Sequence, residues 1–196
     1  MTAPTIAPPG AAPVPGRYPE ELERTWHPAG RPPVHIRALR ADDTELELRF
    51  VQGLSPETLF LRVQYHGGQP TPHDLERLLD LDYVDRLAVA GLVRDEDFDR
   101  IVGVSRFARV EDTTRAECAI VVADDWQGCG LGTELMRSLM QAARARGYTV
   151  LEGGTLAENV GVSAWARRFG FDVQTQPGSG GMVKVTLDLD QLRPPG

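Results

Sequence analysis

Disulfide frameworks and metal clusters are the first features that the sequence lacks. Its 196 residues include only two cysteines, Cys118 and Cys129, which lie on either side of a predicted loop and match neither a disulfide framework nor a metal-ligand spacing. The four histidines all come before residue 74 and show no ligand spacing. We therefore expect no bound metal, and reduced thiols in a cytoplasmic protein.

Long apolar runs and basic clusters are also missing. Prolines interrupt the apolar residues of the N-terminal stretch, which has no early basic cluster, and no segment is long enough for a transmembrane helix. The 21 basic and 28 acidic residues give a net charge of −7, whereas a nucleic-acid partner needs a clustered basic surface. We therefore expect neither a membrane nor a nucleic-acid partner, and a cationic substrate is the better electrostatic match.

The chain contains enough ordinary globular sequence for one domain. Its composition is 41% hydrophobic and 25% charged, and its length suffices for a full core. Residues 1–33 hold nine of the 15 prolines, so we expect an extended, unpacked tail there. The folded domain is predicted to span residues 34–190, followed by a short C-terminal tail at 191–196.

Hydrophobic periodicity predicts an α+β fold for this domain. Leu131, Leu135 and Leu139 form one stripe of a predicted helix, so a strand, a loop and a helix meet near residue 125. The strands predicted between residues 85 and 123 are interpreted as an antiparallel meander. Helical patterns cover residues 42–53, 55–65, 71–80, 130–146 and 158–169, and strand patterns cover 34–39, 85–94, 100–110, 115–123, 148–153, 171–176 and 182–187.

A glycine-rich loop, Gln127-Gly128-Cys129-Gly130-Leu131-Gly132, follows a predicted strand and opens a predicted helix. Backbone amides at such a junction can bind an anion, with help from the helix dipole. The loop lacks the lysine of a Walker motif, and Thr133 stands where a dinucleotide fingerprint needs glycine. The alternative is a glycine-rich turn that binds no ligand.

In this loop the sequence resembles the GCN5-related N-acetyltransferases, the GNAT superfamily, whose signature Gln127, Gly130 and Gly132 match. The resemblance implies a mixed, mostly antiparallel central sheet flanked by helices, with acetyl-CoA as cosubstrate. It further implies that amides from Cys129 to Thr133 hold the pyrophosphate and that the preceding strand pairs with the pantetheine arm. The cofactor-binding residues implied are Ile120, Val121, Val122, Gln127, Gly128, Cys129, Gly130, Leu131, Gly132, Thr133 and Asn159.

Asn159 has a second interpretation. The resemblance places it at the family asparagine that binds near the pantetheine, within Leu156-Ala157-Glu158-Asn159. From the residues alone, it is equally suited to cap the helix that follows.

Within the superfamily the sequence is most similar to bacterial protein lysine acetyltransferases of the Pat type. The similarity is carried by Leu54-Ser55-Pro56-Glu57, by Ala116-Glu117-Cys118-Ala119 and by Asp124-Asp125-Trp126-Gln127. It implies that the protein acetylates an active-site lysine of acyl-CoA synthetases and so switches them off. An acyl-CoA synthetase is therefore the expected partner.

Glu117 is the candidate catalytic residue. A lysine amine with a pKa of about 10.4 is an ammonium at neutral pH, and an ammonium cannot attack a thioester, so a base must remove its proton. The Pat-type resemblance places the general base at Glu117, and apolar neighbours along the strand would raise the pKa of this carboxyl. The alternative is an exposed glutamate at a strand end.

Two functional questions stay open at this point. Many family members place a tyrosine near the leaving sulfur, but Ala166 stands at that position here, which puts a tyrosine general acid in doubt. The alternative functions are N-acetylation of a small-molecule amine and, from another class, a non-catalytic acyl-CoA sensor. Glu117 argues against the sensor.

Overall fold

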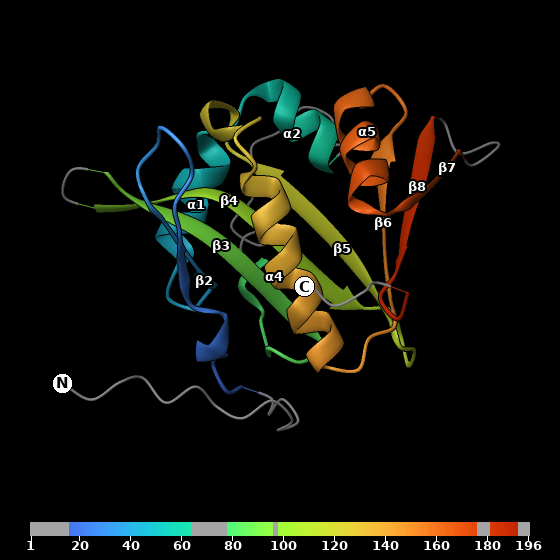
Figure 1. Ribbon diagram of the computed structural model, residues 1–196. Helices are drawn as coiled ribbons and strands as arrows, with labels where there is room; N and C mark the ends of the chain where they lie inside the picture. The colour runs from blue at the N-terminus through green and yellow to red at the C-terminus, as the bar shows by residue number, and fades with distance from the viewer. Residues whose placement is uncertain (1–15, 64–77, 96–97, 176–180, 192–196) are drawn as a thin grey trace.

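A single eight-stranded sheet organises the protein in a computed structural model, which describes residues 16–63, 78–95, 98–175 and 181–191. The strand order is β1-β2-β3-β4-β5-β6-β8-β7, and the only parallel pair within the described residues is β5 with β6 (Figure 1). This confirms the predicted α+β class with a mixed, mostly antiparallel sheet. The strands are β1 (Arg24–Trp26), β2 (Val34–Ala38), β3 (Arg86–Asp95), β4 (Phe98–Arg109), β5 (Arg115–Val122), β6 (Val150–Leu156), β7 (Asp172–Thr175) and β8 (Met182–Asp188).

Helices cover both faces of the sheet. Helix α4 crosses one face, with α5 beside it over the strands at the far end, while α1 packs on the opposite face (Figure 1). Most predicted boundaries agree with the structure within two residues, although the helix predicted at 71–80 lies largely outside the described residues. The helices are α1 (Thr44–Gln52), α2 (Pro56–Val63), α4 (Leu131–Ala145) and α5 (Val160–Phe169), with short 3₁₀ turns η1 (Glu20–Leu22) and η2 (Asp124–Trp126).

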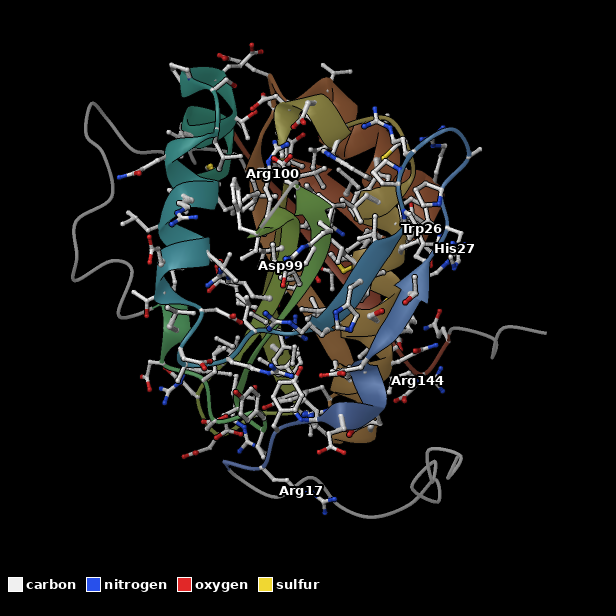
Figure 2. The ribbon with its side chains drawn as sticks, turned by 90° about the vertical axis from the view of Figure 1, so that its left-hand side faces the viewer. Arg17, Trp26, His27, Asp99, Arg100 and Arg144 are labelled. Carbon is white, nitrogen blue, oxygen red and sulfur yellow. The ribbon has the colours of Figure 1, made fainter. Side chains whose placement is uncertain are left out.

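The predicted tail at residues 1–33 is wrong in its second half. Residues 24–26 form β1, which pairs antiparallel with β2, and Leu22 of η1 is buried in the core. Figure 2 faces this hairpin, with Trp26 at the end of β1. A three-residue strand among prolines is too short to show a period of two, so its pairing arises only through contact with β2. The ordered domain therefore begins before residue 34.

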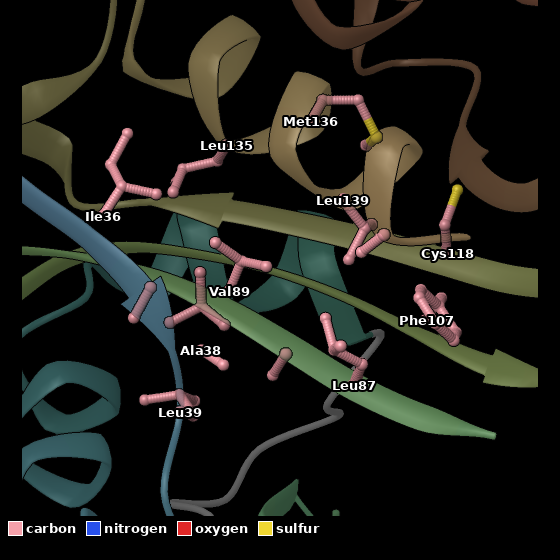
Figure 3. Packing of buried hydrophobic residues seen from close by; sticks show 14 of the residues in the cluster. Ile36, Ala38, Leu39, Leu87, Val89, Phe107, Cys118, Leu135, Met136 and Leu139 are labelled. Carbon is pink, nitrogen blue, oxygen red and sulfur yellow. The ribbon is translucent and has the colours of Figure 1, made fainter. Parts of the chain in front are cut away.

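The core lies between α4 and the middle of the sheet. The predicted stripe of Leu131, Leu135 and Leu139 is fully buried there, and Figure 3 shows Leu135 and Leu139 among the buried residues. Two glycines allow this helix to approach closely, because a Cβ atom on Gly103 of β4 would lie 2.9 Å from Leu135 Cδ1, and one on Gly91 of β3 would lie 3.2 Å from Leu131 Cδ1. Close packing of α4 fixes where its N-terminus lies relative to β5.

Candidate active site

A gap in the sheet forms the site. The parallel pairing of β5 with β6 covers only three residues of each strand and ends where Glu117 lies opposite Glu152. Beyond that point the strands separate, and a cavity of about 670 Å³ lies between Cys118–Val122 of β5 and Gly153–Thr155 of β6. The edge of β5 that faces the gap is therefore open to pairing with an extended ligand.

The glycine loop closes one end of this cavity. Gly128 and Gly130 have φ angles of +73° and +96°, in the left-handed region that side chains other than glycine rarely adopt. The amides of residues 128–132 donate to no acceptor within the described part of the chain, as is usual at a helix start. The amide of Thr133 instead donates to Gly130 O at 3.0 Å, so Thr133 differs from the expected set of free amides.

Helix α5 forms the opposite wall. Asn159 caps it, accepting a hydrogen bond from the Val162 amide at 3.1 Å, which confirms the cap interpretation. Trp165 donates to the Thr133 hydroxyl at 3.1 Å and so links α5 to the first turn of α4. Ala166, at the position where many family members carry tyrosine, is buried and lines the cavity, and no tyrosine does so among the described residues.

The predicted cofactor residues come together at this cavity. Cys129 and Leu131 are exceptions: the Cys129 thiol donates to Trp126 O at 2.9 Å, and the Leu131 side chain is fully buried in the core, so only backbone groups of these two can face a ligand. Lining the cavity are Ile120, Val121, Val122, Gln127, Gly128, Gly130, Gly132, Thr133 and Asn159.

Glu117 lies at the point where the two strands part, on the sheet face that carries α1 and α2. It is the third residue of β5, and its side chain is exposed, so the expected apolar surroundings are not present. Alternation places Cys118, the next residue, on the other face, in the cavity wall. Glu117 has no hydrogen bond or ion pair within the described residues, so its carboxylate is free to meet a substrate.

The neighbouring carboxylate, that of Glu152, is already paired with two cationic side chains. Arg115 Nε donates to Glu152 Oε2 at 3.1 Å, and Lys184 Nζ lies 3.1 Å from the same oxygen. The hydrogen bonds from Arg115 and Lys184 lower the pKa of Glu152, with Arg115 the larger cause. Sequence reasoning missed this cluster, because its members lie on three different strands and no local spacing links them.

Asp124 ties α2 to the start of the glycine loop, a contact that sequence reasoning also missed. Its carboxylate accepts from the Ser55 amide at 3.0 Å, from the Ser55 hydroxyl at 2.8 Å and from the Thr58 hydroxyl at 2.7 Å. Burial alone would raise the pKa of Asp124, but these hydrogen bonds outweigh it and lower the pKa. Ser55, whose hydroxyl also accepts from the Thr58 amide at 3.1 Å at the start of α2, therefore joins two distant segments.

The N-terminal hairpin contacts the glycine loop and the residues on either side of it. Arg24 donates to Glu134 Oε2 at 3.0 Å in the first turn of α4. The Trp26 ring lies 3.7 Å from where a Cβ atom on Gly130 would be. Arg31 donates to Asp125 O at 2.8 Å, and its guanidinium lies 4.8 Å from the centroid of a Trp126 ring. The hairpin therefore holds residues before, within and after the loop.

The described residues lack two further features. They include no group of three or more His, Cys, Asp or Glu side chains that could hold a metal ion. None of their helices combines the length and the apolar character that crossing a bilayer requires.

Comparison with known proteins identifies the fold and the family. The model of the acetyltransferase (GNAT) family matches residues 57–171, which include the gap, the glycine loop and α5. The chain belongs to the GNAT family of acetyltransferases. This membership confirms the predicted fold and an N-acetyltransferase activity.

Two curated GNAT relatives cover most of the chain. It is 35% identical over 156 residues to Acetyltransferase PA5475 of Pseudomonas aeruginosa, covering 80% of this chain and 84% of that protein. It is 30% identical over 137 residues to Acetyltransferase Pat of Mycolicibacterium smegmatis, covering 69% of this chain but only 40% of Pat. The chain is therefore Pat-like in its acetyltransferase region.

Solved GNAT structures share the fold. The GNAT domain of S. lividans PAT superposes with a TM-score of 0.80 at 22% identity, covering 88% of this chain and 99% of that domain. The putative acetyltransferase yncA of Salmonella typhimurium, solved with acetyl-CoA, has a TM-score of 0.64 at 16% identity, covering 83% of this chain and 98% of that one.

Proposed function

We propose that this GNAT enzyme transfers an acetyl group to a lysine side chain of an acyl-CoA synthetase, in the cytoplasm. The observation that carries the proposal is the placement of Glu117, a carboxylate without a partner among the described residues, where the gap between β5 and β6 opens. Likeness to Pat supports a protein substrate. The two free cysteines are those of a protein in a reducing compartment.

The residues around the cavity fit acetyl-CoA. The amides of residues 128–132, which have no acceptor in the described part of the chain, suit the pyrophosphate together with the positive end of the α4 dipole. The open edge of β5 suits the pantetheine amides. Arg168 is the one basic residue among those that line the cavity in the described chain, and it suits a phosphate. Bound there, acetyl-CoA supplies the acetyl group as a thioester.

Glu117 then performs the step that the acceptor requires. It removes a proton from the lysine ammonium, which leaves a neutral amine that can attack the thioester carbon. Because Glu117 faces the α1 and α2 side of the sheet, the acceptor lysine enters from that side. With alanine at position 166, the leaving thiolate takes its proton from solvent rather than from a tyrosine.

The test replaces Glu117 with glutamine, which keeps the shape of the side chain but accepts no proton at neutral pH. Glu117→Gln should bind acetyl-CoA as the parent does, and its turnover should fall by about 10²- to 10⁴-fold, the range for losing a positioned base. Raising the pH should restore part of the rate, because more of the acceptor amine is then neutral. Glu111→Gln, in the exposed turn before the same strand, is the matched control.

The acceptor is tested separately. Purified acyl-CoA synthetases are incubated with the enzyme and acetyl-CoA, and mass spectrometry locates acetyl-lysine. Modification of their active-site lysine is the expected result. Acetylation of small amines alone would favour the small-molecule function, and cofactor binding without any acetyl transfer would favour the sensor. A Glu117→Gln variant with parental turnover at neutral pH would remove Glu117 as the base.

A further inference from the structure

Lys184 is the only lysine among the 21 basic residues of the sequence, and it lies beside the proposed catalytic site. Its side chain extends from β8 and is 39% exposed. The flanking residue Val185 lines the cavity, and so does Gly154, the β6 residue paired with Lys184. An otherwise lysine-free chain therefore places its one side-chain amine next to the gap in the sheet.

Strand register places this amine on the same face as Glu117. Glu117 is opposite Glu152, and Glu152 is two residues before Gly154 on β6. Side chains at these alternate positions, and those of their paired neighbours, project from one face of the sheet. The contact between Lys184 Nζ and Glu152 Oε2 at 3.1 Å agrees with this. The ammonium of Lys184 is therefore held by the residue that is paired with the base, Glu117.

A glycine of β6 lies between Lys184 and the gap. Gly154, the β6 residue paired with Lys184, has no side chain, and the nearest atom to its Cβ position is Met182 Cε of β8, at 3.0 Å. Lys184 pairs with Gly154, which lies beyond the last β6 residue that pairs with β5 and which lines the cavity. A lysine side chain that leaves Glu152 can therefore turn towards the gap over Gly154 once the flexible end of the Met182 side chain shifts.

We infer that Lys184 is a self-acetylation site, modified within the same molecule. Lys184 gives one ammonium proton to Glu117, and its Nζ atom attacks the thioester carbonyl carbon. The carbon–sulfur bond breaks, the nitrogen loses its second proton to solvent, and the leaving thiolate takes one proton from solvent. The inference rests on the proposed function, because it uses the same base and the same acetyl donor.

Acetylation would change the electrostatics beside the base. The neutral amide of acetyl-lysine no longer pairs with Glu152, which keeps Arg115 as its cationic partner. Glu152 then presents more negative charge next to Glu117, and the acetylated side chain occupies space on the acceptor side. Turnover on an external acceptor should therefore fall as Lys184 becomes acetylated.

The experiment uses the purified full chain and acetyl-CoA without any acceptor. Intact mass should rise by one acetyl group, peptide mapping should place it on Lys184 rather than on the terminal amine, and the first-order rate should not depend on protein concentration. Lys184→Arg, which keeps a cation for Glu152, should gain no such group and should retain turnover on an external acceptor. Glu117→Gln should slow the modification by about 10²-fold or more.

Three results would overturn the inference. They are an unmodified Lys184 after prolonged incubation, a rate that rises with protein concentration, and equally fast modification of the unfolded chain. Titration calorimetry with CoA and an acceptor assay accompany the measurement. If CoA binds and the acceptor is acetylated while Lys184 is not, self-acetylation alone fails. If CoA binds but neither amine is acetylated, the proposed function fails with it.

Discussion

The contact between Trp26 and the glycine loop yields a quantitative prediction. Trp26→Ala removes the ring that lies 3.7 Å from the Cβ position of Gly130, a residue held at a φ of +96°. Ordering one backbone residue costs about 1–2 kcal/mol. If Gly130 becomes mobile in the free Trp26→Ala enzyme, CoA binding must supply the free energy that orders this residue again. The dissociation constant for CoA should then rise about tenfold, since about 1.4 kcal/mol corresponds to a factor of ten.

Titration calorimetry with CoA measures this effect, and thermal unfolding is recorded in parallel. Trp26→Phe keeps an aromatic ring and should lose much less affinity, while His27→Ala, the exposed residue next along the chain, should bind as the parent does. The KM for acetyl-CoA should rise with little change in kcat, because the base is untouched. Unchanged CoA affinity in a Trp26→Ala protein that unfolds at a lower temperature would refute the reasoning and leave Trp26 a packing residue only.

Two other contacts can be tested in the same way. Arg168→Ala should raise the KM for acetyl-CoA several-fold at low salt, and this increase should be smaller at high salt. Arg167→Ala, at the exposed neighbouring residue, is the control and should leave the KM unchanged. Equal effects of the two substitutions would contradict a phosphate contact for Arg168. Asp124→Asn weakens the acceptor for Ser55 and Thr58, so it should lower the unfolding temperature at neutral pH. Because the pKa of Asp124 is lowered in the fold, the stability that it contributes is present above about pH 4 and lost as the pH falls through the folded pKa. The parent and Asp124→Asn should therefore converge in acid, and a constant difference down to low pH would contradict this.

Local signals in the sequence sufficed for the elements and for the loop. The leucine stripe of α4 repeats at helical spacing, and the three strands from β3 to β5 are separated by turn residues, so both follow from residues close together in the chain. The turn at Gly128 and Gly130 can also be predicted from local sequence, since glycine adopts their positive φ angles without strain.

Only the tertiary structure determined the contacts between segments that are distant in the sequence. The three residues of β1 become a strand by pairing with β2, and Trp26 meets Gly130 across about a hundred positions of sequence. Glu117 is exposed because the strands part beside it, which neither its apolar neighbours in sequence nor their period could indicate. The cluster of Arg115, Glu152 and Lys184 comes from three strands that the register aligns. Periodicity reports which face of an element is buried, whereas these contacts depend on which strands are neighbours, and that is determined only when the sheet assembles.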